Sequence, residues 1–169
     1  MRLALRRQVR ARAGDHCEYC RLRQEHEAHR PFHTEHIIAT SHRGGDELGN
    51  LALACQLCNL LKGPNLSGMD PNTERLERLF HPRKDVWSEH FRIEGAKITG
   101  TTAIGRTTAW LLEMNSDDRL ALRETLIELG EWPCLVRRRS CTCLVSTTKS
   151  SRSVSKAATT GSPMFREGS

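Results

Sequence analysis

The sequence places two short cysteine pairs on either side of a central stretch. The first pair is Cys17-Glu-Tyr-Cys20 and the second is Cys55-Gln-Leu-Cys58, with thirty-four residues between them. Two residues between cysteines allow both sulfurs to face one ion, and two such pairs complete a tetrahedral shell of thiolates. Four ordinary buried cysteines are the alternative, but two matched pairs rarely arise by chance in 169 residues. We therefore predict a closed, structural zinc site formed by Cys17, Cys20, Cys55 and Cys58.

The length of the stretch between the pairs is also informative. Compact zinc fingers separate their ligand pairs by about 12–20 residues, so this longer stretch leaves room for an inserted hairpin. Apolar runs predict its strands within residues 31–39 and 50–54, with Gly44-Gly45 as a turn between them. A helix is expected over residues 56–62, ended by Gly63-Pro64. Because a closed four-cysteine site has no open position, any chemistry must come from this inserted stretch and the helix.

The inserted stretch carries polar residues in a characteristic order. It reads Phe32-His-Thr-Glu35-His36, then Asn50-Leu-Ala-Leu-Ala54, then Cys58-Asn59-Leu-Leu-Lys62. Residues 9–66 thereby resemble the HNH endonuclease family in its zinc-stapled, four-cysteine form. The family signature is an acid–His pair on the first strand, an Asn opening the second, and a His or Asn on the helix. The resemblance implies an α+β fold with a ββα-metal (HNH) core.

The resemblance also implies a role for each polar residue of the signature. His36 is the expected general base, since imidazole titrates near neutral pH. Glu35 and Asn59 are the expected oxygen ligands of one catalytic Mg²⁺ or Mn²⁺, and the amide of Asn50 is expected to hold the loop that bears His36. Many family members carry Asp in place of Glu35 and His in place of Asn59, and both replacements keep a ligand atom available. The implied activity is metal-dependent hydrolysis of DNA phosphodiester bonds, leaving a 5′-phosphate and a 3′-hydroxyl.

Two basic residues beside the signature are candidates for contacts with nucleic acid. Arg43 precedes the glycine pair, and Lys62 follows Asn59 on the same helix. The alternative function is a catalytically inactive, zinc-stabilised nucleic-acid-binding module, and a purely structural zinc adaptor ranks last. A decayed domain usually loses its base or its metal ligand first, whereas every polar residue of the signature is present. The sequence therefore favours an active enzyme with DNA as its partner.

The flanking segments predict further elements. Residues 2–13 are expected to form an Arg-rich helix closed by Gly14, with Leu5 and Val9 on one face. The later elements are expected to be a loop-rich segment over residues 65–85, a hairpin over 91–95 and 97–99, and helices over 103–114 and 117–129. The chain then divides into an HNH nuclease core with its basic helix (1–66), a C-terminal extension that packs on the core (67–133), and a disordered Ser/Thr/Arg-rich tail (134–169). In the tail, Cys134, Cys141 and Cys143 are expected to be free thiols.

The distribution of charge and apolar residues limits the remaining classes of function. The formal net charge is +6, but residues 134–169 hold seven Lys and Arg against one acid, which accounts for all of it. Residues 1–23 carry seven Arg against two acids, which suits contact with phosphate, although solvated charge is the commoner explanation. The sequence contains no run of eighteen apolar residues, so no membrane span is predicted, and the short apolar stretch near Met1 predicts no secretory signal. We expect a cytoplasmic protein whose thiols stay reduced.

Overall fold

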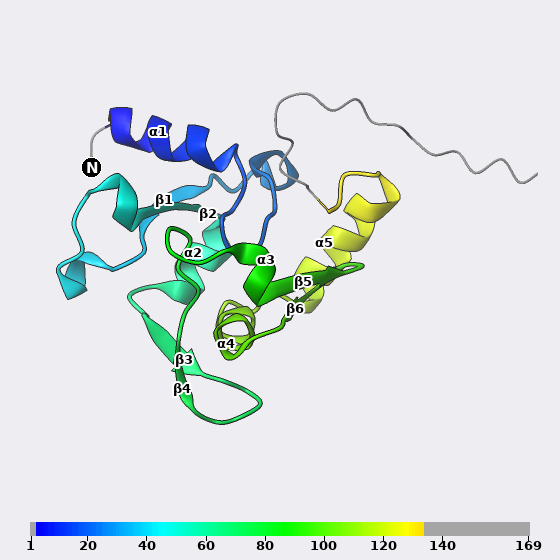
Figure 1. Cartoon of the computed structure of the whole chain (residues 1–169). Helices are drawn as coiled ribbons and strands as arrows, with labels where there is room; N and C mark the ends of the chain where they lie inside the picture. The colour runs from blue at the N-terminus through cyan, green and yellow to red at the C-terminus, as the bar shows by residue number, and fades with distance from the viewer. Residues whose placement is uncertain (1–2, 134–169) are drawn as a thin grey trace, which may run out of the picture. The chain divides into compact units, whose positions relative to one another are not determined.

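The computed structural model describes residues 3–133 of the chain (Figure 1). The expected tail, with Cys134, Cys141 and Cys143, lies outside these residues. Within them, helices alternate with three two-stranded antiparallel sheets, which is the α+β class expected from the sequence. None of the described helices is both long and apolar enough to cross a membrane.

A hairpin followed directly by a helix forms the centre of the domain. Strand β1 (His33–His36) pairs with β2 (Leu51–Ala54), and His36 lies opposite Leu51. Helix α2 (Gln56–Lys62) is capped by Cys55, whose sulfur accepts a hydrogen bond from the backbone N–H of Cys58 at 3.4 Å. The predicted ββα arrangement is therefore confirmed, and the observed bounds of α2 are the predicted ones.

Helix α1 (Leu3–Ala13) covers the opposite side of the hairpin from α2 (Figure 1). Its Val9 and Ala13 are buried, and the guanidinium of Arg12 donates to the carbonyls of Leu48 and Leu51 at 2.8 and 2.5 Å. Because helices cover both of its faces, all four residues of β2 are buried.

The loop between β1 and β2 contains two short 3₁₀ helices, Thr40–His42 and Leu48–Asn50. Gly44 lies at its tightest point. A Cβ atom there would meet the carbonyl oxygen of Ile38 at 1.7 Å and the amide nitrogen of Asn50 at 2.8 Å. The loop therefore keeps its path only with glycine at this position.

The residues after α2 begin with a hairpin that the sequence does not predict. Strands β3 (Ser67–Met69) and β4 (Leu76–Arg78) pair within the segment expected to be loop-rich. Both strands have only three residues and none of these is buried, so no alternation of apolar and polar residues marks them. Asp70, which directly follows β3, accepts two hydrogen bonds from the guanidinium of Arg106, at 3.0 and 2.6 Å.

The remaining elements confirm the predicted hairpin and helices. The short helix α3 (Trp87–His90) leads into the hairpin of β5 (Phe91–Glu94) and β6 (Lys97–Gly100). Helices α4 (Ala103–Leu111) and α5 (Asp117–Glu128) follow, and the hydroxyl of Thr102 caps α4 by accepting from the backbone N–H of Gly105 at 3.1 Å.

One apolar cluster extends through both halves of the described chain. It contains Val9, Leu51 and Leu53 from the first half, and Phe80, Phe91, Ile98 and Leu126 from the second. The core and the extension thus share their interior.

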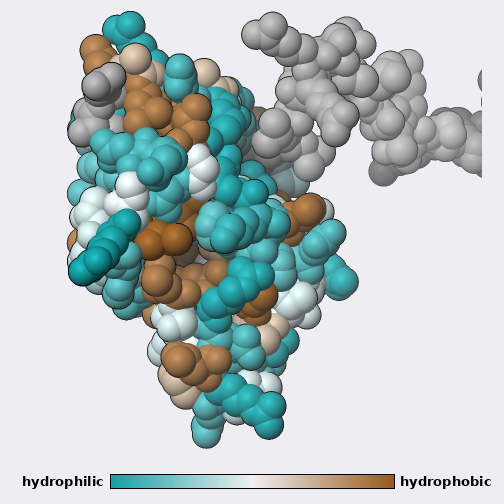
Figure 2. Space-filling view, turned by 60° about the vertical axis from the view of Figure 1, so that its left-hand side comes forward, coloured by the Kyte–Doolittle hydropathy of each residue, from teal (hydrophilic) through white to brown (hydrophobic). Residues whose placement is uncertain are grey.

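On the surface, Figure 2 shows one face where hydrophilic residues predominate and hydrophobic residues gather around a hollow near its middle.

The close approach at Gly44 leads to a prediction about the loop. Gly44→Ala should lower the free energy of unfolding by about 1–3 kcal/mol, as other overpacking substitutions do, because the new methyl group displaces Ile38 or Asn50. Chemical denaturation of zinc-loaded protein measures this change.

The control is Gly49→Ala in the same loop, where an added Cβ has no atom within 4 Å. It should change the free energy of unfolding by no more than about 0.5 kcal/mol. Equal stabilities of the two variants would contradict the described loop.

Candidate functional site

The four cysteines of the two pairs meet at one point inside the domain. Their sulfur atoms all lie within 4.8 Å of one another, and the sulfurs of Cys20 and Cys55 are 3.8 Å apart. A tetrahedral zinc ion with bonds of about 2.3 Å would separate its sulfur ligands by about 3.8 Å. All four side chains are buried. In residues 3–133, no other group of three or more His, Cys, Asp or Glu residues is placed to hold a metal ion.

A buried arginine from α5 lies against these sulfurs. The guanidinium of Arg119 donates to the sulfur of Cys58 at 3.4 Å from both terminal nitrogens and to that of Cys55 at 3.7 Å. Burial lowers the pKa of Arg119, but the neighbouring cysteine thiolates outweigh this effect and raise it. Since four thiolates around Zn²⁺ carry a net charge of −2, this guanidinium compensates part of that charge. No local sequence pattern assigns Arg119 a role, because the contact joins residues sixty-one positions apart.

The imidazole of His36 lies at the end of β1, with its side chain 22% exposed. Its Nε2 atom is 2.7 Å from a carboxylate oxygen of Asp46 in the loop between β1 and β2. This hydrogen bond lowers the pKa of Asp46, so the carboxylate is ionised at neutral pH. An ionised carboxylate only accepts hydrogen bonds, so Nε2 is the donor in this contact, and in the neutral imidazole the lone pair then lies on Nδ1. The sequence analysis did not identify Asp46, although an acid directly after Gly44-Gly45 was a visible signal.

The carboxylate of Glu35 lies on the other side of the hairpin. It accepts a hydrogen bond from the hydroxyl of Tyr19, and one of its oxygens is 3.4 Å from the ammonium of Lys62 on α2. Glu35 is only 6% exposed, and burial raises its pKa, although Lys62 and Tyr19 favour the ionised form. Neighbouring residues of a strand point to opposite faces. The structure therefore separates the contacts of Glu35 from those of His36.

The two asparagines of the signature differ in how their amides are used. Asn50 accepts from the backbone N–H of Ile38 at 2.8 Å and donates to the carbonyls of Ile38 and Gly45, each at 3.0 Å. These bonds hold the two sides of the loop together just beyond His36. Asn59 is half-buried on α2, and its side-chain amide makes no hydrogen bond within residues 3–133. Its oxygen is therefore available to a ligand.

Of the two basic residues expected to contact nucleic acid, Lys62 is buried and Arg43 is exposed. Lys62 is 1% exposed, and its ammonium lies 3.2 Å from the carbonyl of His36, in addition to its contact with Glu35. Its position therefore supports the end of β1 and corrects the expectation of a surface contact. Arg43 is exposed, with a left-handed backbone (φ 62°) at the end of the first 3₁₀ helix.

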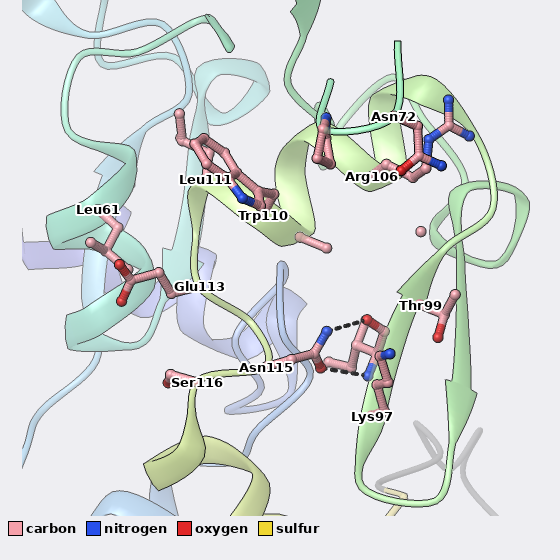
Figure 3. Close-up of a pocket in the computed structure, with 14 residues that line it drawn as sticks. Leu61, Asn72, Lys97, Thr99, Arg106, Trp110, Leu111, Glu113, Asn115 and Ser116 are labelled. Atoms are coloured by element: carbon pink, nitrogen blue, oxygen red, sulfur yellow. Dashed lines mark hydrogen bonds between the residues drawn. The ribbon is translucent and has the colours of Figure 1, made fainter. Parts of the chain in front are cut away.

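A cavity of about 920 Å³ lies away from His36 and the cysteines, between α2, α4 and β6 (Figure 3). Trp110 and Leu61 contribute apolar walls, while the amide of Asn115 is bonded to the backbone of Ile98 at 2.8 Å in both directions. Neither His36 nor any predicted metal ligand lines this cavity. Its size alone does not make it the hydrolytic site.

Comparison with known proteins relates the central stretch of the chain to one family. The family model described as HNH endonuclease matches residues 17–65. This range includes both cysteine pairs, β1, β2 and α2, but neither α1 nor the extension. No curated protein and no solved structure matches the chain.

The contact between Arg119 and the cysteine sulfurs predicts an effect on zinc affinity. Arg119→Gln should weaken zinc binding by about 10- to 100-fold, because substitutions of residues that bond to metal ligands commonly have this effect. Competition with a chromophoric chelator measures the affinity.

Arg119→Lys keeps the charge but loses the two-pronged contact, and it should lie between the wild type and Arg119→Gln. Circular dichroism at saturating zinc would show that both variants fold. An unchanged zinc affinity in folded Arg119→Gln would contradict the assigned role.

Proposed function

Because residues 17–65 form an HNH endonuclease domain with a four-cysteine, zinc-binding centre, we propose that the protein is a metal-dependent endonuclease that hydrolyses DNA phosphodiester bonds. The pair of His36 and Asp46 is the observation that carries this proposal. It presents a partly exposed imidazole whose Nε2 is bonded to a carboxylate. A histidine held in this way is suited to remove a proton from water.

In the proposed reaction, Nδ1 of His36 takes a proton from the water molecule that attacks the phosphorus atom. The new bond joins the water oxygen to phosphorus, and the bond from phosphorus to the 3′ oxygen breaks; the 3′ oxygen leaves with that electron pair and takes a proton from solvent. Asp46 accepts the hydrogen bond from Nε2, so its negative charge stabilises the imidazolium as it forms. Asn50 keeps the loop that bears Asp46 in place through its bonds to Ile38 and Gly45. The products are a 5′-phosphate and a 3′-hydroxyl.

Glu35 and Asn59 would hold the catalytic divalent cation, Mg²⁺ or Mn²⁺. Their oxygen atoms are the ligands that such hard cations prefer, and the amide of Asn59 has no other partner within residues 3–133. The cation supplies positive charge that neutralises the phosphate during the reaction. Lys62 compensates the charge of Glu35 in this structure, so a cation bound by Glu35 would have to replace this ammonium at the carboxylate.

A second function is favoured by the same contact of Glu35. A carboxylate that is buried and bonded to Tyr19 and Lys62 is a structural residue as well as a ligand. If it never exchanges Lys62 for a cation, the domain is a zinc-stabilised module that binds nucleic acid without cutting it. Dependence of cleavage on Mg²⁺ or Mn²⁺ separates the two functions.

Substitution of the proposed base tests the enzymatic function. In a plasmid-nicking assay with zinc-loaded protein, the wild type should nick supercoiled DNA with Mg²⁺ or Mn²⁺ added and not without. His36→Ala should lower the rate by about 10²- to 10⁴-fold, which is the usual contribution of a general base.

The matched control is His29→Ala, an exposed histidine in the segment before β1. It should nick at the wild-type rate. If His36→Ala nicks as fast as His29→Ala, His36 is not the base. If the zinc-loaded wild type shows no metal-dependent nicking, the binding module is the correct function.

A further inference from the structure

A second cavity, of about 320 Å³, lies between α1 and the beginning of β1. Three arginines of α1 line it, together with His33 and Thr34 of β1 and two apolar residues, and no lining residue is acidic. The arginines are Arg6, Arg7 and Arg10. The cavity therefore combines a high density of positive charge with hydrogen-bond donors, and its chemistry suits an anion.

The walls of this arginine pocket are held by contacts outside it. Buried Val9 and the bonds from Arg12 to the carbonyls of Leu48 and Leu51 fix α1 on the hairpin. The guanidinium of Arg10 donates to Asp15 at 2.7 Å and reaches the side-chain oxygen of Gln24 at 3.4 Å. That same oxygen accepts from the backbone N–H of Phe32 at 2.6 Å. The pocket is therefore built into the fold, and Arg10 forms its fixed side.

The charges of the other two arginines are not compensated by ion pairs with the described residues. Arg6 and Arg7 are exposed, and neither forms an ion pair with any residue of the described range 3–133. A guanidinium presents donors in a planar fork that matches two oxygens of one phosphate group. Two uncompensated arginines beside a fixed third one are therefore suited to a phosphate.

The pocket is close to the proposed base along the strand. Thr34 and His36 are two residues apart and thus share one face of β1, at a separation of about 6.6 Å. Each nucleotide of a DNA strand rises about 3.4 Å along the helix axis, and because the strand also winds around that axis, its neighbouring phosphates are farther apart than this rise. A phosphate in the pocket would thus be one or two nucleotides away from a phosphate at His36. Glu35 and Lys62 lie on the other side of the hairpin.

We propose that the arginine pocket binds a backbone phosphate of the DNA strand one or two nucleotides from the bond that is cut. It positions the strand and takes no part in the chemistry. The identity of the ligand rests on the proposed nuclease function. The pocket itself lies partly on α1, outside residues 17–65 that the family model matches.

The double variant Arg6→Gln/Arg7→Gln tests the pocket in the full-length, zinc-loaded protein. Fluorescence anisotropy with a labelled DNA duplex, without added divalent cation, should show a dissociation constant about tenfold higher than that of the wild type at low salt. Because both side chains serve one phosphate, the slope of log K against log salt should become shallower by about 0.9. In cleavage assays KM should rise by a similar factor while kcat at saturating DNA stays unchanged.

The matched control is Arg75→Gln/Arg92→Gln, which removes the same charge from two exposed arginines outside the pocket. Equal dissociation constants for the two double variants would overturn the pocket and leave the nuclease function standing. Normal binding without cleavage by the wild type would overturn the nuclease function and leave the pocket standing. Wild-type protein that binds no DNA would overturn both.

A further arm distinguishes a DNA phosphate from a free one. Inorganic phosphate should compete with the duplex no better than chloride does at the same ionic strength. Stronger competition by phosphate, absent in Arg6→Gln/Arg7→Gln, would assign the pocket to a free phosphate group and overturn the strand-positioning role.

Discussion

The convergence of four cysteine sulfurs at one point, where together they can hold a zinc ion, is the constraint on which the rest of the domain depends. Two strands of four residues each form a hairpin that has little stability in water by itself. Binding of zinc to structural sites of this kind contributes about 10–16 kcal/mol in zinc-finger peptides, which is as large as the whole stability of an ordinary domain, about 5–15 kcal/mol. The zinc centre therefore determines whether β1, β2 and α2 hold their places at all.

The same centre connects the two halves of the described chain. Arg119 of α5 contacts the sulfurs of Cys55 and Cys58, and the indole N–H of Trp87 donates to the carbonyl of Tyr19 between the first two cysteines at 2.7 Å. The extension is thus bonded to both cysteine pairs. We infer that loss of zinc loosens the extension as well as the hairpin.

The proposed chemistry is placed around this scaffold and not within it. The loop between β1 and β2 brings Asp46 to His36, and this loop closes tightly because Gly44 and Asn50 pack against Ile38. The base faces one side of the hairpin, whereas Glu35 faces α2. A scissile phosphate would therefore have to lie at the end of β1, where groups from both sides of the strand can reach it.

Much of this architecture is predictable from local patterns, and the rest depends on distant contacts. The spacing of the cysteines, the apolar runs of the hairpin and the Gly63 stop signal of α2 are local, and the structure confirms them. The hairpin of β3 and β4 has no such pattern, because its short strands are mostly exposed. Residue type also did not reveal that Lys62 would be buried, since lysine on a short helix is usually solvated.

The contacts of Asp46 and Arg119 illustrate the same limit. Each side chain acquires its partner only when the chain folds back over ten or more residues, with His36 in one case and Cys58 in the other. Sequence patterns report the identity of such residues but not the partner that gives them a role. For the proposed enzyme, the partners decide whether an imidazole can act as a base and whether a thiolate cluster is stable.

The chemistry of the DNA ends is the most direct measurement of the proposed hydrolysis. Plasmid nicked by the zinc-loaded protein with Mg²⁺ or Mn²⁺ should be resealed by DNA ligase, which requires a 5′-phosphate next to a 3′-hydroxyl. Nicks that appear only with the added cation and are fully resealed would establish the reaction. Nicks that ligase does not seal, or none at all from protein with one zinc ion bound per chain, would contradict it.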